Sequence, residues 1–177
     1  LPVIEEINKH NEDINFLITT VTLSSSGVFK KKLEKYKNTT HRFFPLDTVN
    51  LSGKFLNKWK PDLVCFVDSE IWPNFLFKIK EMNIPLVLIN GRITKKTLKK
   101  WLIFPSFAGK VFQNFDMCLP CSKDSKNNLE KLKVKKLSYF GNLKFAIKTT
   151  NETLKKSNIE ILDNFNVWCA TSTHDGE

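Results

Sequence analysis

The feature that most constrains the fold is a regular alternation of short, continuous apolar runs with segments of helical periodicity. An apolar run without polar alternation is typical of a parallel strand buried on both faces, and strand–helix alternation is typical of α/β domains. We therefore predict a Rossmann-like parallel sheet with helices on both faces. The predicted strands are 14–21, 41–46, 62–67, 84–89, 116–119, 136–140 and 167–170, and the predicted helices are 1–10, 28–36, 51–59, 71–82, 94–101, 105–114, 123–132 and one that ends at 164.

The composition changes near residue 148, where a stretch rich in Lys, Thr and Asn lacks a core pattern. We interpret its start as a linker and predict an N-terminal domain at 1–148, followed by a linker and the start of a second domain at 149–177. The chain begins without Met, and it ends within a predicted loop. We therefore expect the sequence to be a fragment.

The formal net charge of +10 would suit a nucleic-acid partner. However, Arg42 and Arg92 are the only arginines among the 28 basic residues, and proteins that recognise bases usually need Arg for bidentate contacts. We therefore expect lysines on ordinary solvated faces and no nucleic-acid partner. No apolar run approaches the ~20 residues of a membrane span.

The cysteines at 65, 118, 121 and 169 each lie in an apolar run. Cys118 and Cys121 form a CxxC pair, but no second pair or paired His accompanies it, which disfavours zinc. A redox-active CxxC pair is expected at the start of a helix, whereas Cys118 lies at the end of a predicted strand. We expect buried, reduced thiols in a reducing cytoplasm.

The segment from Val67 to Asn74 places Asp68 and Glu70 between a predicted buried strand and a predicted helix. Ligands of open α/β sheets bind at the carboxyl ends of strands, so both carboxylates are candidate functional groups. The ordinary alternative is that Asp68 or Ser69 caps the helix while Trp72 fills the core.

Three further loops follow predicted strands and carry polar groups: Asn90 to Arg92, Gly141 to Lys144, and Ser172 to Glu177. Each has an ordinary alternative, because Gly141 could form a simple turn, Arg92 could pair structurally with Glu70, and His174 could be a surface residue. The hydroxyl-rich last loop could instead bind phosphate through backbone N–H groups at a helix start.

Taken together and in order, these segments resemble motifs of the bacterial Kdo (3-deoxy-D-manno-octulosonic acid) transferases, which use CMP-Kdo to glycosylate a lipid A precursor. The resemblance covers essentially the whole chain. It rests on Thr19-Thr20-Val21-Thr22, Phe44-Pro45-Leu46-Asp47, Asp68-Ser69-Glu70-Ile71-Trp72-Pro73-Asn74, Ile89-Asn90-Gly91-Arg92-Ile93-Thr94, Gly141-Asn142-Leu143-Lys144-Phe145 and Ala170-Thr171-Ser172-Thr173-His174-Asp175-Gly176-Glu177.

The resemblance implies the N-terminal half of a GT-B glycosyltransferase and an inverting reaction without a metal or a cofactor other than the donor CMP-Kdo. It implies that Glu70 positions the acceptor. Because adjacent parallel strands lie ~5 Å apart, we further expect Arg92 or Lys144 to hold Glu70 ionised. The remaining implied site residues bind substrate (Asp68, Arg92, Asn142, Lys144) or the CMP of the donor (Ser172, Thr173, His174, Gly176, Glu177).

The sequence also departs from the family pattern. Asp68 stands where the family usually has Glu, Gly91 replaces a usual Ala, Thr94 replaces a usual Ser, and 121–132 lacks a usual Gln and Arg. The family's first strand and the Glu taken as its catalytic base precede the segment that matches Leu1. The resemblance therefore implies that residues 1–177 alone are inactive.

The resemblance also implies a lipid A precursor as acceptor and a place on the cytoplasmic face of the bacterial inner membrane. From Lys99 to Phe104, two lysines are followed by four apolar residues, and this segment could bind that anionic surface. An ordinary amphipathic helix end would look the same. Two rival functions stay open: a GT-B transferase for another nucleotide sugar, and a non-enzymatic Rossmann-like binding module.

Overall fold

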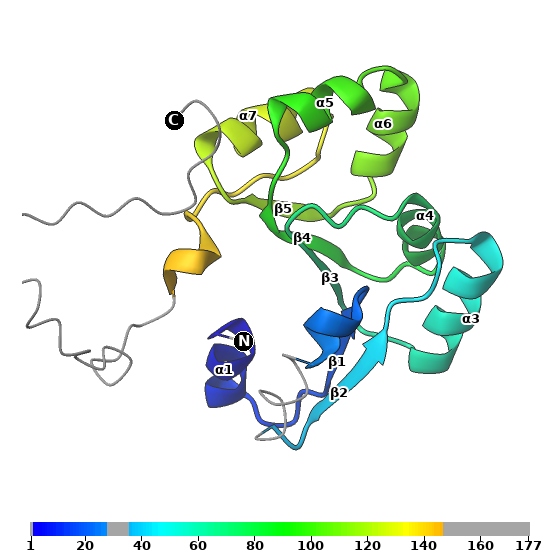
Figure 1. Cartoon of the computed structure of the whole chain (residues 1–177), viewed down its shortest axis with the longest axis vertical. Helices are drawn as coiled ribbons and strands as arrows, with labels where there is room; N and C mark the ends of the chain where they lie inside the picture. The colour runs from blue at the N-terminus through cyan, green and yellow to red at the C-terminus, as the bar shows by residue number, and fades with distance from the viewer. Residues whose placement is uncertain (1, 28–35, 147–177) are drawn as a thin grey trace, which may run out of the picture. The chain divides into compact units, whose positions relative to one another are not determined.

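The computed structural model describes residues 2–27 and 36–146 (Figure 1). Residues Leu1–Ala146 form one compact unit. The helix predicted at 28–36 falls on the gap, apart from Tyr36, and everything predicted beyond 146 lies outside the described residues. In chain order the elements are α1 (Pro2–His10), β1 (Phe16–Thr20), β2 (Thr39–Phe43), α3 (Val49–Trp59), β3 (Val64–Val67), α4 (Pro73–Glu81), β4 (Leu86–Gly91), α5 (Lys95–Trp101), α6 (Pro105–Phe112), β5 (Met117–Pro120), α7 (Lys123–Lys131) and the 3-10 helix η1 (Leu143–Ala146).

Parallel strands alternate with helices along the described chain, which confirms the predicted fold class. β1 pairs with β2, with Phe16 opposite Thr39. β4 lies between β3 and β5. Three details differ from prediction. β2 begins and ends earlier than the predicted 41–46, and the strand predicted at 136–140 is reduced to one parallel bridge between Cys118 and Leu137. β4 continues to Gly91, whereas the sequence analysis placed Asn90 and Gly91 in a loop.

The described strands form two hydrogen-bonded ladders, β1–β2 and β3–β4–β5. Leu63, just before β3, and Val67, the last residue of β3, are 53% and 50% exposed.

The core lies between β3–β4–β5 and the helices that cross one face of this sheet. α4 contacts α6, as expected because successive right-handed crossovers between neighbouring parallel strands lie on the same face. The fully buried side chains come from α4 (Leu76, Ile79), β4 (Leu86, Leu88), α6 (Val111, Phe112) and the α7 region (Leu129, Leu132). This packing fixes the strand ends from which the site loops emerge.

The first turn of α4 is capped from a distant loop. Its N-cap residue, Trp72, makes no side-chain cap bond. Instead, Asp47 accepts hydrogen bonds from the backbone N–H groups of Asn74 (3.2 Å) and Phe75 (3.0 Å). The alternative that Asp68 or Ser69 caps this helix is therefore wrong, whereas Trp72 does pack, half-buried, against the core.

Candidate substrate pocket

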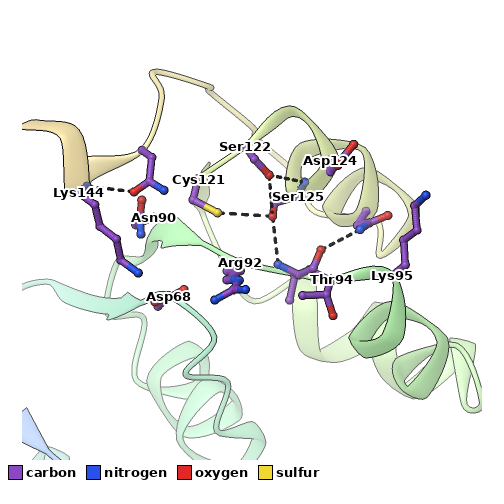
Figure 2. Close-up of a pocket in the computed structure, with 13 residues that line it drawn as sticks. Asp68, Asn90, Arg92, Thr94, Lys95, Cys121, Ser122, Asp124, Ser125 and Lys144 are labelled. Atoms are coloured by element: carbon purple, nitrogen blue, oxygen red, sulfur yellow. Dashed lines mark hydrogen bonds between the residues drawn. The ribbon is translucent and has the colours of Figure 1, made fainter. Parts of the chain in front are cut away.

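A pocket of about 420 Å³ opens at the carboxyl ends of β3, β4 and β5 (Figure 2). This is where the doubly wound architecture places ligands. Each strand, and the segment after the bridge at Leu137, sends one loop to the pocket. The lining residues are Asp68, Asn90, Arg92, Ile93, Thr94, Lys95, Cys121, Ser122, Asp124, Ser125, Asn128, Asn142 and Lys144. The structure thus brings the predicted substrate-binding residues Asp68, Arg92, Asn142 and Lys144 together in one cavity.

Asp68 occupies a strained backbone position directly after β3. Its φ is +61°, in the left-handed region that non-glycine residues rarely adopt. Two backbone bonds hold it there, from its own N–H to the Ile89 carbonyl and from the Arg92 N–H to its carbonyl, both 3.0 Å. Its side-chain Oδ1 is buried and lacks a partner among the described residues. An unsatisfied acceptor in a pocket on strained backbone is typical of a ligand-binding position.

Asn90, at a register irregularity of β4, joins two of the site loops. It also has a positive φ, +54°. Its buried side-chain Oδ1 accepts a 3.1 Å hydrogen bond from the backbone N–H of Leu143. Asn142 in turn accepts a 3.0 Å bond from the Lys144 N–H. These bonds hold the loop that carries Lys144 against the end of β4.

Within the described part of the chain, the charges that line the pocket form no ion pairs. Arg92, Lys95 and Lys144 supply three cations, and Asp68 and Asp124 supply two carboxylates. None of the five forms an ion pair with a residue in the described part of the chain. Cations with free hydrogen-bond donors suit carboxylate or phosphate groups, whereas a carboxylate acceptor suits hydroxyls. The pocket therefore fits an anionic, hydroxyl-bearing ligand.

Glu70 lies outside the residues that line this pocket. It is exposed, and its carboxylate accepts a 2.8 Å hydrogen bond from Trp72 Nε1. The hypothesis that Glu70 meets Arg92 is not realised. It is Ser69 that reaches the Arg92 loop, by donating a 3.0 Å bond to the Arg92 carbonyl. The acceptor-positioning role of Glu70 remains a prediction, as does donor binding by 172–177, which lies outside the described residues.

The α7 segment contributes site residues that the sequence analysis missed. Ser122 caps α7 by accepting a bond from the Ser125 N–H. Ser125 and Asn128 are buried and bond the backbone of Ile93 in the neighbouring loop. The Ser-x-x-Ser spacing signals the helix cap, but only the packing of α7 against the β4 loop reveals the contacts to Ile93.

The cysteines differ in their surroundings. Cys118 is fully buried, and this burial raises the pKa of its thiol to about 12. Cys121 is half-buried and lines the pocket, with its Sγ 3.6 Å from Ser125 Oγ. Cys65 is exposed, which corrects the expectation of a buried thiol there. All three are free, and no cluster of three or more potential metal ligands occurs within residues 2–27 and 36–146.

Comparison with known proteins identifies the family. Residues 1–147 match the family model described as 3-deoxy-D-manno-octulosonic-acid transferase (kdotransferase). A probable mitochondrial 3-deoxy-D-manno-octulosonic acid transferase of Arabidopsis thaliana is 30% identical over 188 residues, covering 100% of this chain and 41% of that protein. The 3-deoxy-D-manno-octulosonic acid transferases of Rickettsia typhi and Haemophilus influenzae are 34% and 24% identical, covering 98% and 99% of this chain.

The chain spans 37% of the length of the Rickettsia protein and 42% of the Haemophilus protein. The family match extends over nearly all of the described parallel α/β unit, including every residue that lines the pocket. The chain therefore belongs to the Kdo transferase family, and its described residues are the N-terminal α/β domain of the family's GT-B fold.

Proposed function

We propose that this chain is the acceptor-side part of an inverting glycosyltransferase that transfers Kdo from CMP-Kdo to a lipid A precursor in lipopolysaccharide synthesis. The observation that carries the proposal is the pocket at the carboxyl edge of the sheet. It is lined by cations that have no ion-pair partner among the described residues and by a carboxylate oxygen, Asp68 Oδ1, that has no hydrogen-bond partner there. A lipid A precursor bears phosphates and hydroxyls, and Kdo bears a carboxylate and hydroxyls. Both match this chemistry.

In the proposed reaction, a base removes a proton from the acceptor hydroxyl, whose oxygen then attacks the anomeric carbon as CMP departs. Arg92 and Lys144 bind the anionic groups of the sugar acid or of the acceptor phosphates. Asp68 Oδ1 accepts a hydrogen bond from a substrate hydroxyl. The CMP is bound by the hydroxyls of Ser172 and Thr173 together with His174, Gly176 and Glu177. Donors held at fixed positions stabilise the charge that develops on the departing phosphate.

The proposed site of action is the cytoplasmic face of the bacterial inner membrane. None of the helices in the described ranges has the length and apolar character that crossing a bilayer requires. Between α5 and α6, Leu102, Ile103 and Phe104 form an apolar tip and are 41%, 67% and 70% exposed. Exposed lysines cover α5, namely Lys95, Lys96, Lys99 and Lys100.

This arrangement favours membrane contact over an ordinary amphipathic helix end. In the ordinary case the apolar residues would be covered by the core, whereas Ile103 and Phe104 are mostly exposed. An anionic lipid surface attracts the lysines, and the apolar side chains beside them can insert into it. α5 has seven residues and so spans about 10 Å. Because Lys95 at its start lines the pocket, a membrane-bound acceptor would lie within reach.

Initial-rate assays of the full-length protein with CMP-Kdo and a lipid A precursor test the proposal. Arg92→Ala and Lys144→Ala should each lower kcat/KM by at least about tenfold, because each removes a charge-assisted contact. Lys131→Ala is the matched control, since Lys131 is exposed on α7 and does not line the pocket. Unchanged rates in both pocket variants would exclude this pocket from the reaction.

A panel of nucleotide sugars separates the proposal from its first rival, a GT-B transferase with another donor. Sugar transfer with CMP-Kdo and with no other donor of the panel supports the proposal. Transfer with a different nucleotide sugar, and none with CMP-Kdo, would overturn it. The second rival, a non-enzymatic binding module, predicts no transfer at all. Membership in a family whose named relatives are transferases argues against that rival.

A further inference from the structure

We infer that Ser125 and Asn128 on α7 are positioning residues that set the placement of Arg92 in the pocket; the inference rests on the proposed function. Both bond the backbone of Ile93, the residue between Arg92 and Thr94. Ser125 Oγ accepts a 3.3 Å hydrogen bond from the Ile93 N–H, and Asn128 Nδ2 donates a 2.8 Å bond to the Ile93 carbonyl. Both polar groups of this residue's backbone are thus held by side chains of one helix.

The opposite side of the same loop is held by the loop after β3. The Arg92 N–H donates a 3.0 Å bond to the Asp68 carbonyl, and Ser69 Oγ donates a 3.0 Å bond to the Arg92 carbonyl. The backbone of residues 92 and 93 is therefore bonded from both sides. These bonds fix the backbone from which the Arg92 side chain extends, although the side chain itself is exposed.

Burial makes the α7 contacts selective for this loop. Ser125 and Asn128 are 4% and 6% exposed. A buried polar group is costly unless it is hydrogen-bonded, so these two side chains favour the one loop position that satisfies them. The Ile93 side chain, 1% exposed, adds a packing anchor at the same point. In Figure 2, dashed lines join Ser125 to Ser122 on one side and to the segment between Arg92 and Thr94 on the other.

The functional consequence follows from the sensitivity of catalysis to geometry. A displacement of about 1 Å in a substrate-positioning group can cost on the order of 100-fold in rate. Ser125 and Asn128 hydrogen-bond the backbone of Ile93, and they position Arg92 through this adjacent residue. They act through Arg92, and removing them matters only as long as Arg92 is present.

A double-mutant cycle in the full-length protein tests this dependence. It compares kcat and KM of the wild type, Asn128→Ala, Arg92→Ala and the double variant, with CMP-Kdo and a lipid A precursor as substrates. We expect Asn128→Ala to lower kcat/KM about tenfold in the wild-type background and less than about twofold in the Arg92→Ala background. Asn127→Ala is the matched control, because Asn127 is an exposed asparagine on the same helix.

The outcomes are distinct. Equal losses in both backgrounds, or no loss in the wild-type background, would overturn the inference while leaving the proposed function intact. A normal rate for Arg92→Ala would also overturn the inference, whereas the pocket is excluded from the reaction only if Lys144→Ala is normal as well. Melting temperatures of all variants identify any that fail to fold, and Ser125→Ala then replaces Asn128→Ala in the cycle. Ser125→Thr, which keeps the hydroxyl, should restore most of the rate lost in Ser125→Ala.

Discussion

Asn74 donates hydrogen bonds to Asp47 from both its backbone and its side chain. Asp47 Oδ2 accepts a 3.2 Å bond from the Asn74 backbone N–H, and Asn74 Nδ2 donates a 2.8 Å bond to the Asp47 carbonyl. The pair joins the loop before α3 to the first turn of α4. Both residues lie in segments that resemble family motifs, and the structure gives them a shared role: they fix the start of the helix that follows the Asp68–Glu70 loop.

Removing this cap should destabilise the protein. Asp47→Ala leaves the backbone N–H groups of Asn74 and Phe75 without their carboxylate and should lower the free energy of unfolding by about 1–2 kcal/mol. Denaturant unfolding followed by circular dichroism measures the change. Asp62→Ala, at an exposed aspartate before β3, should stay within about 0.5 kcal/mol of wild type. Equal stability of both variants would show that the cap contributes little.

Glu70→Gln should separate a structural from a catalytic role of this residue. The Gln Oε1 can still accept the bond from Trp72 Nε1, so the fold should be retained. If Glu70 positions the acceptor, turnover should fall by on the order of 100-fold. Melting temperature and turnover are measured on the same sample. Trp72→Phe breaks the same hydrogen bond and leaves the carboxylate in place. An equal loss of turnover in both variants would therefore show that Glu70 acts by holding Trp72. A stable and fully active Glu70→Gln enzyme would remove Glu70 from the site.

The apolar tip between α5 and α6 should be required for binding to anionic vesicles. Replacing Ile103 and Phe104 by Ser removes apolar area that is exposed and available for insertion. In a sedimentation assay with phosphatidylglycerol-containing vesicles, the double variant should bind at least about tenfold more weakly. Leu46→Ser, at an apolar residue that is 76% exposed elsewhere, is the control. High salt should weaken wild-type binding because it screens the lysines of α5.

Cys118 should make stability fall at alkaline pH. Its pKa rises from 9.0 in the unfolded chain to about 12 in the folded protein, because burial penalises the thiolate. Between these values the unfolded state holds fewer protons, so the stabilisation is complete below pH 9 and is lost as the pH rises toward 12. The difference in unfolding free energy between wild type and Cys118→Ala should change by up to about 1.4 kcal/mol per pH unit in this range. A constant difference from pH 7 to 11 would contradict the assigned burial effect.

The sequence predicts the strands and the location of the site because both depend on local patterns. Continuous apolar runs mark β3, β4 and β5, and the parallel architecture then places Asp68, Arg92 and Lys144 at one edge. The short bridge at Leu137 was overpredicted as a strand, because an apolar run does not reveal how much of it finds a partner.

Contacts between distant segments could not be predicted in the same way. Asp47 caps a helix that begins 26 residues later, and no local rule connects the two. Ser125 and Asn128 look like ordinary polar positions of α7 until packing buries them against Ile93. The predicted contact of Glu70 with Arg92 is absent among the described residues. Strand adjacency fixes where the two loops begin but not where their side chains point, and the Glu70 side chain accepts a bond from Trp72 instead.

The division of the sheet into two ladders has a practical consequence for handling this polypeptide. β1 and β3 each pair with one neighbour among the described residues, so each leaves a row of backbone amide and carbonyl groups without a strand partner in that part of the chain. Such rows act as templates for strands of other molecules. A preparation of residues 1–177 should therefore self-associate at high protein concentration, and light scattering should increase with concentration more steeply than for a protein that stays monomeric.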